Sequence, residues 1–75
     1  MSILDAKIKI LDYLEEAEKY GFSYGIGRDI LMDYYDIETK TKDIHIFNMA
    51  IYQLTVEHVI CKTSWGYYKI NRDRR

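Results

Sequence analysis

Residues 41–71 constrain the fold most, because an amphipathic helical pattern is followed there directly by two short β-rich runs. The apolar residues at helical spacing in this stretch are Ile44, Phe47, Ala50, Ile51 and Leu54. They fall on one side of a helix, which predicts that this side is buried. The runs at 58–62 and 67–71 are rich in β-branched and aromatic residues, and the polar segment 63–66 separates them. This pattern predicts a β-hairpin after the helix.

The opposite side of this helix carries residues that suit contact with a long polar ligand. They are Thr41, Lys42, His45, Asn48, Met49, Tyr52 and Gln53. In a DNA major groove, Asn and Gln pair bidentately with adenine, His contacts guanine acceptors, and Met and Tyr offer apolar contact to a thymine methyl group. The same residue types are also ordinary on a solvated helix, so plain surface is the competing interpretation.

A helix that leads directly into a hairpin resembles the second half of a winged helix-turn-helix domain. The residues that carry the resemblance are Ile46, Ala50, Ile51 and Leu54 in the helix, Val59 and Ile60 in the second strand, and 66–70 in the wing and third strand. The resemblance covers the last 35 residues or so well and the first 40 or so more loosely. It implies an α+β fold of three helices with a small antiparallel wing sheet of two or three strands, and it implies double-stranded DNA as the partner.

Under this resemblance residues 1–75 form a single winged-helix domain. Residues 1–38 hold the first helix, a short strand and the second helix, 39–71 hold the recognition helix and the wing, and 72–75 are a basic tail. Ser2 is expected to cap the first helix, which runs to about residue 20, and Gly21 is expected to end it. The predicted inner side of this helix holds Ile3, Leu4, Ile10, Leu11, Leu14 and Ala17.

Residues 21–27 contain three glycines, yet they lack the features of a phosphate-binding loop. Such a loop needs a Lys-Ser/Thr pair after its last glycine, where this chain has Arg28 and Asp29. A short strand is expected here, with Phe22 or Tyr24 packed against it. The second helix is expected from Arg28 to residue 35 or 36, with Ile30, Leu31, Tyr34 and Ile37 facing inward. Either Thr39 or Thr41 is expected to cap the third helix.

Charge is distributed unevenly along the chain, although the net formal charge is only −1. Residues 1–38 carry nine acids and four bases, whereas residues 39–75 carry three acids and seven bases. Local field rather than total charge attracts a polyanion. The candidate contacts to DNA phosphates are Lys40, Lys62, Lys69, Arg72, Arg74 and Arg75, with Lys42 also available.

Neither catalysis nor a metal site is predicted. The serines and histidines lack the spacing of a nucleophilic site, and His45, His58 and Cys61 lack the second ligand pair that structural zinc requires. Cys61 is alone in the sequence and is expected to be buried. No apolar run reaches the roughly 20 residues needed to cross a bilayer, and no signal peptide is apparent. We therefore expect a cytoplasmic protein that is not an enzyme, with no cofactor and no small-molecule ligand.

Trp65 lies in the predicted turn of the hairpin and has three competing interpretations. It packs locally on Tyr67, which is the expectation we favour, or stacks on nucleotides, or anchors a protein contact.

The expected function is that of a DNA-binding transcriptional regulator or recombination accessory factor, acting as a homodimer or with a partner protein. In size the chain resembles compact regulators of phages, archaeal viruses and mobile elements. One alternative is a winged helix used for protein interaction, in which the acidic first half engages a basic partner. Another alternative is single-strand binding through Trp65, Tyr67 and Tyr52.

Overall fold

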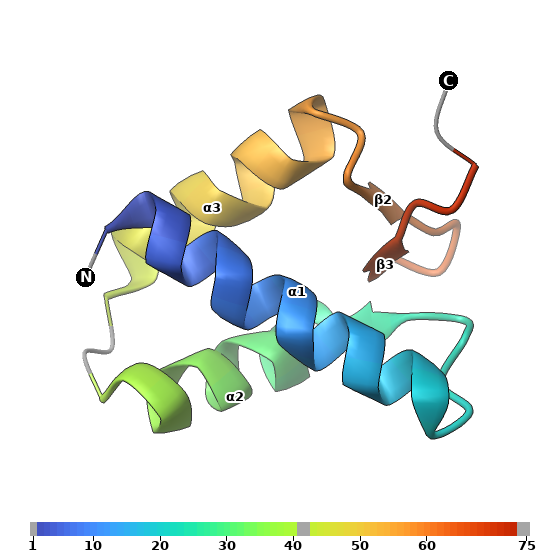
Figure 1. Ribbon diagram of the computed structural model, residues 1–75, viewed down its shortest axis with the longest axis horizontal. Helices are drawn as coiled ribbons and strands as arrows, with labels where there is room; N and C mark the ends of the chain where they lie inside the picture. The colour runs from blue at the N-terminus through green and yellow to red at the C-terminus, as the bar shows by residue number, and fades with distance from the viewer. Residues whose placement is uncertain (1, 41–42, 74–75) are drawn as a thin grey trace.

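Three helices and a small antiparallel sheet form the described part of the computed structural model, which covers residues 2–40 and 43–73 (Figure 1). The helices are α1 (Ile3–Lys19), α2 (Arg28–Thr39) and α3 (Ile44–Val56). The strands are β1 (Ile26–Gly27), β2 (Ile60–Lys62) and β3 (Tyr67–Ile70). The α+β class and the element order are therefore as predicted. None of these helices is both long and apolar enough to cross a membrane.

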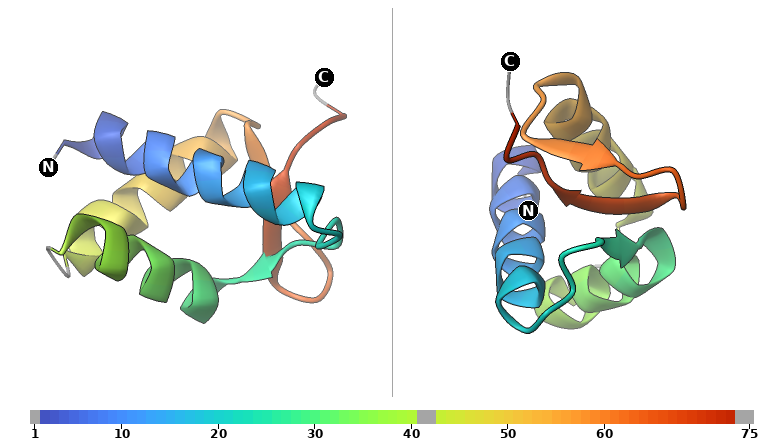
Figure 2. Two further views of the ribbon diagram at one scale, coloured as in Figure 1. Left: turned by 60° about the horizontal axis from the view of Figure 1, so that its bottom comes forward. Right: turned by 90° about the vertical axis from the view of Figure 1, so that its right-hand side faces the viewer.

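The sheet has the strand order β1-β3-β2, so the last strand in the sequence lies in the middle. β2 and β3 form the predicted hairpin, in which Ile60 pairs with Ile70 and Lys62 with Tyr68. β1 pairs antiparallel with the other edge of β3, where Ile26 lies opposite Tyr68. The sheet closes one end of the helical layer, as the right-hand view of Figure 2 shows. The two halves of the chain are thus joined through β3.

The ends of α1 are as predicted. The Ser2 hydroxyl accepts a hydrogen bond from the Asp5 amide at 3.1 Å. After Tyr20, Gly21 takes a φ of +95°, which glycine adopts without the steric penalty that other residues carry.

The connection between α2 and α3 differs from the prediction. α2 continues to Thr39, whose hydroxyl donates to the Tyr35 carbonyl at 2.8 Å. Lys40 then ends the helix in the left-handed conformation, with φ of 58°, at the position where glycine is usual. The cap of α3 is Asp43, whose carboxylate accepts from the Ile46 amide at 3.1 Å. The prediction of a Thr39 cap is wrong, and Thr41 lies outside the described residues.

The core lies between the three helices and the inner side of the sheet. Its buried side chains are Ala6, Ile10, Leu14, Ala17, Ile26, Leu31, Tyr35, Phe47, Ala50, Ile51, Leu54, Ile60, Tyr68 and Ile70. Four residues that were expected to face inward are exposed instead, namely Leu4, Ile30, Ile37 and Ile44. The helices are buried along narrower stripes than the apolar residues suggest, and Ala6 and Tyr35 occupy places in these stripes.

Gly25 occupies a tight position beside the sheet, and this leads to a testable prediction. A Cβ atom there would lie 2.9 Å from the Tyr68 carbonyl oxygen, and the φ of Gly25 is +109°. Gly25→Ala should therefore lower the free energy of unfolding by about 3 kcal/mol, combining backbone strain with a steric clash. Gly21 also has a positive φ but has open space around it. Gly21→Ala should cost only about 1 kcal/mol, and equal losses in urea denaturation would contradict the proposed clash.

Candidate nucleic-acid interface

The side of α3 that faces away from the core carries most of the predicted base-contacting residues. Phe47, Ala50, Ile51 and Leu54 are buried, and α3 packs mainly on α1. The outer side exposes His45, Asn48 and Tyr52, while Met49 and Gln53 are half-buried at its edge. Thr41 and Lys42 lie outside the described residues. The structure therefore brings five of the seven predicted residues onto one helix, with three of them well exposed.

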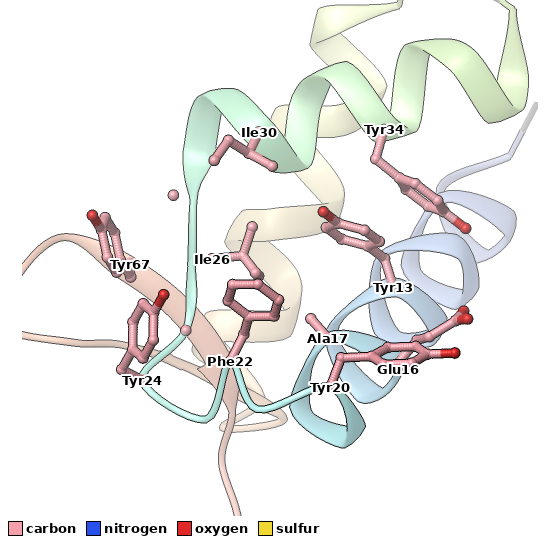
Figure 3. A pocket seen from close by; sticks show the side chains of 12 residues that line it. Tyr13, Glu16, Ala17, Tyr20, Phe22, Tyr24, Ile26, Ile30, Tyr34 and Tyr67 are labelled. Carbon is pink, nitrogen blue, oxygen red and sulfur yellow. The ribbon is translucent and has the colours of Figure 1, made fainter.

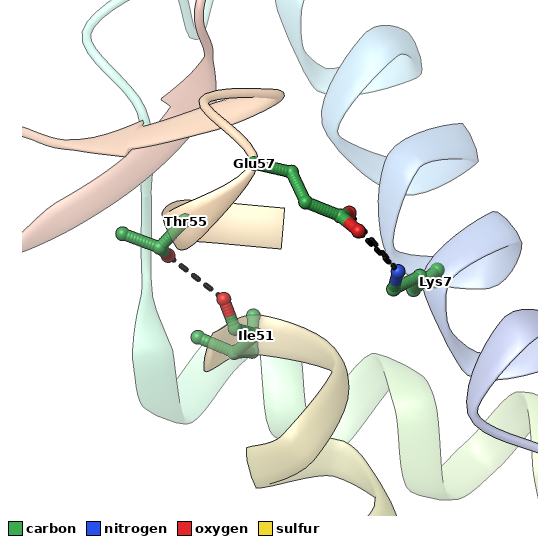
Figure 4. Close-up of polar contacts among 4 residues, drawn as sticks. All are labelled: Lys7, Ile51, Thr55 and Glu57. Atoms are coloured by element: carbon green, nitrogen blue, oxygen red, sulfur yellow. Dashed lines mark hydrogen bonds and ion pairs between the residues drawn. The ribbon is translucent and has the colours of Figure 1, made fainter. Parts of the chain in front are cut away.

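Two polar contacts fix the C-terminal end of α3 (Figure 4). The Thr55 hydroxyl donates to the Ile51 carbonyl at 2.8 Å within the helix. Glu57, directly after the helix, accepts from Lys7 Nζ on α1 at 3.0 and 3.2 Å. Since Glu57 is half-exposed, the pair adds little stability, on the order of 0.5 kcal/mol. The pair links the end of α3 to α1, while the buried side chains of α3 provide most of the packing between the two helices.

The hairpin follows α3 after a single sharp bend at His58, where φ is 61°. The Asn71 side-chain amide donates to the His58 carbonyl at 3.1 Å, and the Asn71 backbone amide donates to the Val59 carbonyl at 3.0 Å. These bonds tie the end of β3 to the end of α3. In the right-hand view of Figure 2 the β2–β3 turn extends away from α1. α3 and β2 are in contact, so the hairpin continues directly from the C-terminal end of α3.

The hairpin lysines lie on opposite faces of the sheet. Lys62 pairs with Tyr68 and its Nζ lies 6.0 Å from the centre of that ring, whereas Lys69 pairs with Cys61. Because successive residues in a strand alternate between faces, Lys62 and Lys69 point to different sides. The two charges do not form one patch. A hairpin inserted edge-on into a DNA groove would instead present one lysine on each side.

The remaining predicted phosphate contacts are dispersed. Lys40 is exposed where α2 ends. Arg72 contacts the Glu18 carboxylate on α1 at 3.0 Å, so its charge is partly neutralised within the chain. Arg74 and Arg75 lie outside the described residues. Within the described residues the tail thus supplies one basic side chain, that of Arg72, and this side chain contacts the acidic helix α1.

Arg28 is a basic residue of this region that the sequence interpretation assigned only to the acidic first half. Its guanidinium carbon lies 5.3 Å from the centre of the Phe47 ring, so the start of α2 is held against α3 by a cation–π contact. The side chain is half-buried. No local pattern links residue 28 with residue 47, and only the folded arrangement reveals Arg28 as a candidate phosphate contact.

Trp65 does not pack as expected. It is 81% exposed in the hairpin turn. The Tyr67 ring lies near Tyr24 instead, with the two centroids 6.0 Å apart. The turn itself is ordered by Thr63, whose carbonyl accepts from the Gly66 amide at 2.9 Å. The prediction that Trp65 packs on Tyr67 is wrong, and the Trp65 ring is open to a partner.

Other sequence-based candidates gain no support as chemical centres. Cys61 is half-buried rather than buried, because it lies on the outer face of the sheet opposite Lys69. Across residues 2–40 and 43–73, no three side chains of His, Cys, Asp or Glu are grouped so as to hold a metal ion.

Comparisons with protein-family models, curated proteins and solved structures found no match for this chain. A functional proposal therefore depends on the geometry and charge of the chain itself.

Proposed function

We propose that this chain is a winged helix-turn-helix domain that binds double-stranded DNA, with α3 entering the major groove and the β2–β3 hairpin acting as the wing. The observation that carries the proposal is the placement of α3. One side of it is packed on α1, its polar side is open, and it leads directly into a basic hairpin. The strand order β1-β3-β2, in which a short strand before α2 joins the hairpin, supports the same fold assignment.

The dimensions of α3 suit this role. Its 13 residues correspond to a helix about 20 Å long, and a major groove about 12 Å wide admits one helix. Asn48, His45 and Tyr52 would face the base edges, while Lys62, Lys69, Lys40 and Arg28 would approach phosphates. A single domain makes few base contacts, so two copies on adjacent half-sites, or a partner protein, would provide useful specificity. A transcriptional regulator or recombination accessory factor is the biological role that we infer.

Binding to a duplex of random sequence should depend steeply on salt. If about five basic side chains neutralise phosphates, log K plotted against log salt concentration should have a slope near −4.5. Fluorescence anisotropy with a labelled duplex at several salt concentrations measures this slope. A slope near zero would remove the proposal. Selection from a pool of random duplexes then tests base readout, and enrichment of a common motif is the expected result.

The exposure of Trp65 favours a second candidate, binding of single-stranded nucleic acid. Bases stack readily on exposed aromatic rings, independently of sequence. Because Trp65 is the only tryptophan, its fluorescence reports on that ring alone. Stronger quenching by a single-stranded oligonucleotide than by the matching duplex would favour this candidate over duplex binding.

A further inference from the structure

A groove of about 510 Å³ opens between α1 and the start of α2, with β1 and the loop before it at one end (Figure 3). Six aromatic side chains line it: Tyr13, Tyr20, Phe22, Tyr24, Tyr34 and Tyr67. In Figure 3, α3 lies behind the groove. This volume lies in the range of ligand sites, roughly 300–1,000 Å³. The groove is therefore a large concave surface separate from the outer side of α3.

The aromatic rings line the groove without filling it. Tyr13 and Tyr34 stack with their centroids 4.1 Å apart and form one wall. Across the groove, Phe22 and Tyr24 meet edge to face at 6.1 Å, and Tyr67 continues this second wall. Phe22 and Tyr24 were expected to pack against the short strand, but both are exposed. They flank β1 as part of the groove, while Ile26 takes the buried position.

Exposed aromatic side chains gathered in one place usually mark an interaction surface. Tyr20, at the mouth of the groove, is 75% exposed, and Ile30 on the opposite rim is exposed as well. None of the described residues that line the groove is basic, and one of them, Glu16, is acidic. The surface is thus aromatic with a negative charge at its edge.

The surroundings of the groove are also acidic. A second depression beside it is lined by Asp12, Glu15 and Glu16, and Lys19 is the one basic residue among its described lining. The pKa of the Tyr34 hydroxyl is raised, first by burial and then by the negative charges of Glu38, Asp12 and Glu16. These carboxylates therefore act on the stacked wall of the groove. A cationic occupant would be favoured there and an anionic one disfavoured.

We propose that this groove binds an arginine side chain carried by a basic peptide segment of a partner protein. The planar guanidinium would stack on the tyrosine rings and donate hydrogen bonds to the Glu16 carboxylate. Arginine suits the site better than lysine, because its guanidinium is flat, more weakly hydrated and able to form two parallel bonds to a carboxylate. The flanking peptide would lie along the aromatic walls, a common mode of recognition for extended segments. The proposal is independent of DNA binding by α3.

A random peptide library displayed on phage, selected against the folded chain, tests this inference. Enriched peptides should share an arginine, and the corresponding synthetic peptides should bind in isothermal titration calorimetry. Replacing that arginine with citrulline, which has the same shape without the charge, should weaken binding at least about tenfold. This comparison leaves the protein unchanged. Failure to enrich peptides, or equal binding of the citrulline peptide, would overturn the proposal.

Protein variants locate the binding site. Glu16→Gln should weaken binding of the arginine peptide about tenfold. Glu15→Gln, an exposed neighbour that lines only the second depression, should not. Tyr20→Ala should weaken the peptide and leave DNA binding intact, and Tyr52→Ala on α3 should do the reverse. Peptide binding unaffected by both Glu16→Gln and Tyr20→Ala would overturn the proposed site. Sedimentation velocity tests whether the chain associates with itself. Self-association that Tyr20→Ala abolishes would also overturn the proposed site, because a second copy of the chain would then occupy the groove.

Discussion

Phe47→Ala is expected to lower the free energy of unfolding by about 3–5 kcal/mol, the cost typical of deleting a fully buried phenylalanine. Phe47 has no exposed surface, and its ring lies 5.3 Å from that of Tyr35. It also lies 5.3 Å below the Arg28 guanidinium, so the substitution removes contacts between α3 and α2 at once. Small domains have total stabilities of about 5–15 kcal/mol. The variant should therefore lose much of its free energy of unfolding, which urea denaturation followed by circular dichroism measures.

Ile44→Ala provides the matched control for Phe47→Ala. Ile44 is on the same helix and was expected to face the core, but it is 54% exposed. Its truncation should change stability by no more than about 0.5 kcal/mol. Together the two variants test which side of α3 faces the core. The exposure of His45, Asn48 and Tyr52 depends on that orientation. A larger loss for Ile44→Ala than for Phe47→Ala would show that the outer side of α3 has been assigned incorrectly.

Reversing both hairpin charges, with Lys62→Glu and Lys69→Glu, should weaken duplex binding about a hundredfold at 50 mM salt. Loss of two phosphate contacts should also make the salt slope shallower by about 1.8. Because the two lysines point to opposite faces of the hairpin, each single reversal should contribute a comparable part. Anisotropy with the same labelled duplex measures all three variants.

Lys9→Glu with Lys19→Glu is the control for this double reversal. It makes the same change in net charge on α1, outside the hairpin. If binding depends on local field, the α1 variant should retain most of its affinity. Equal losses in the two double variants would show that only total charge matters, and the hairpin would no longer be assigned as the wing.

The features that the sequence predicted well are those encoded locally. The buried positions Phe47, Ala50, Ile51 and Leu54 follow helical spacing, and the hairpin follows from two β-rich runs around a turn. The Ser2 cap and the Gly21 terminus are likewise short-range effects. These elements could be predicted because neighbouring residues determine them.

The features that were missed depend on contacts between distant residues. Leu4 and Ile37 are apolar and occur at plausible spacing, but the packing of three short helices leaves them exposed. Lys40 ends α2 in a conformation for which no glycine gave a signal. The aromatic groove combines residues of α1, α2, β3 and the loop before β1, so no stretch of sequence contains it. Its only sequence signal was the high tyrosine content, eight in 75 residues.

The central position of β3 has a consequence for how the protein is made. Gly27 pairs with Tyr67, so β1 cannot pair until the ribosome has synthesised about forty further residues. β2 waits for the same strand. The three helices can form before β3 has been synthesised, but neither β1 nor β2 can pair before it. Ile26 and Ile60, which are buried in the folded chain, therefore lack their strand partners until β3 is present.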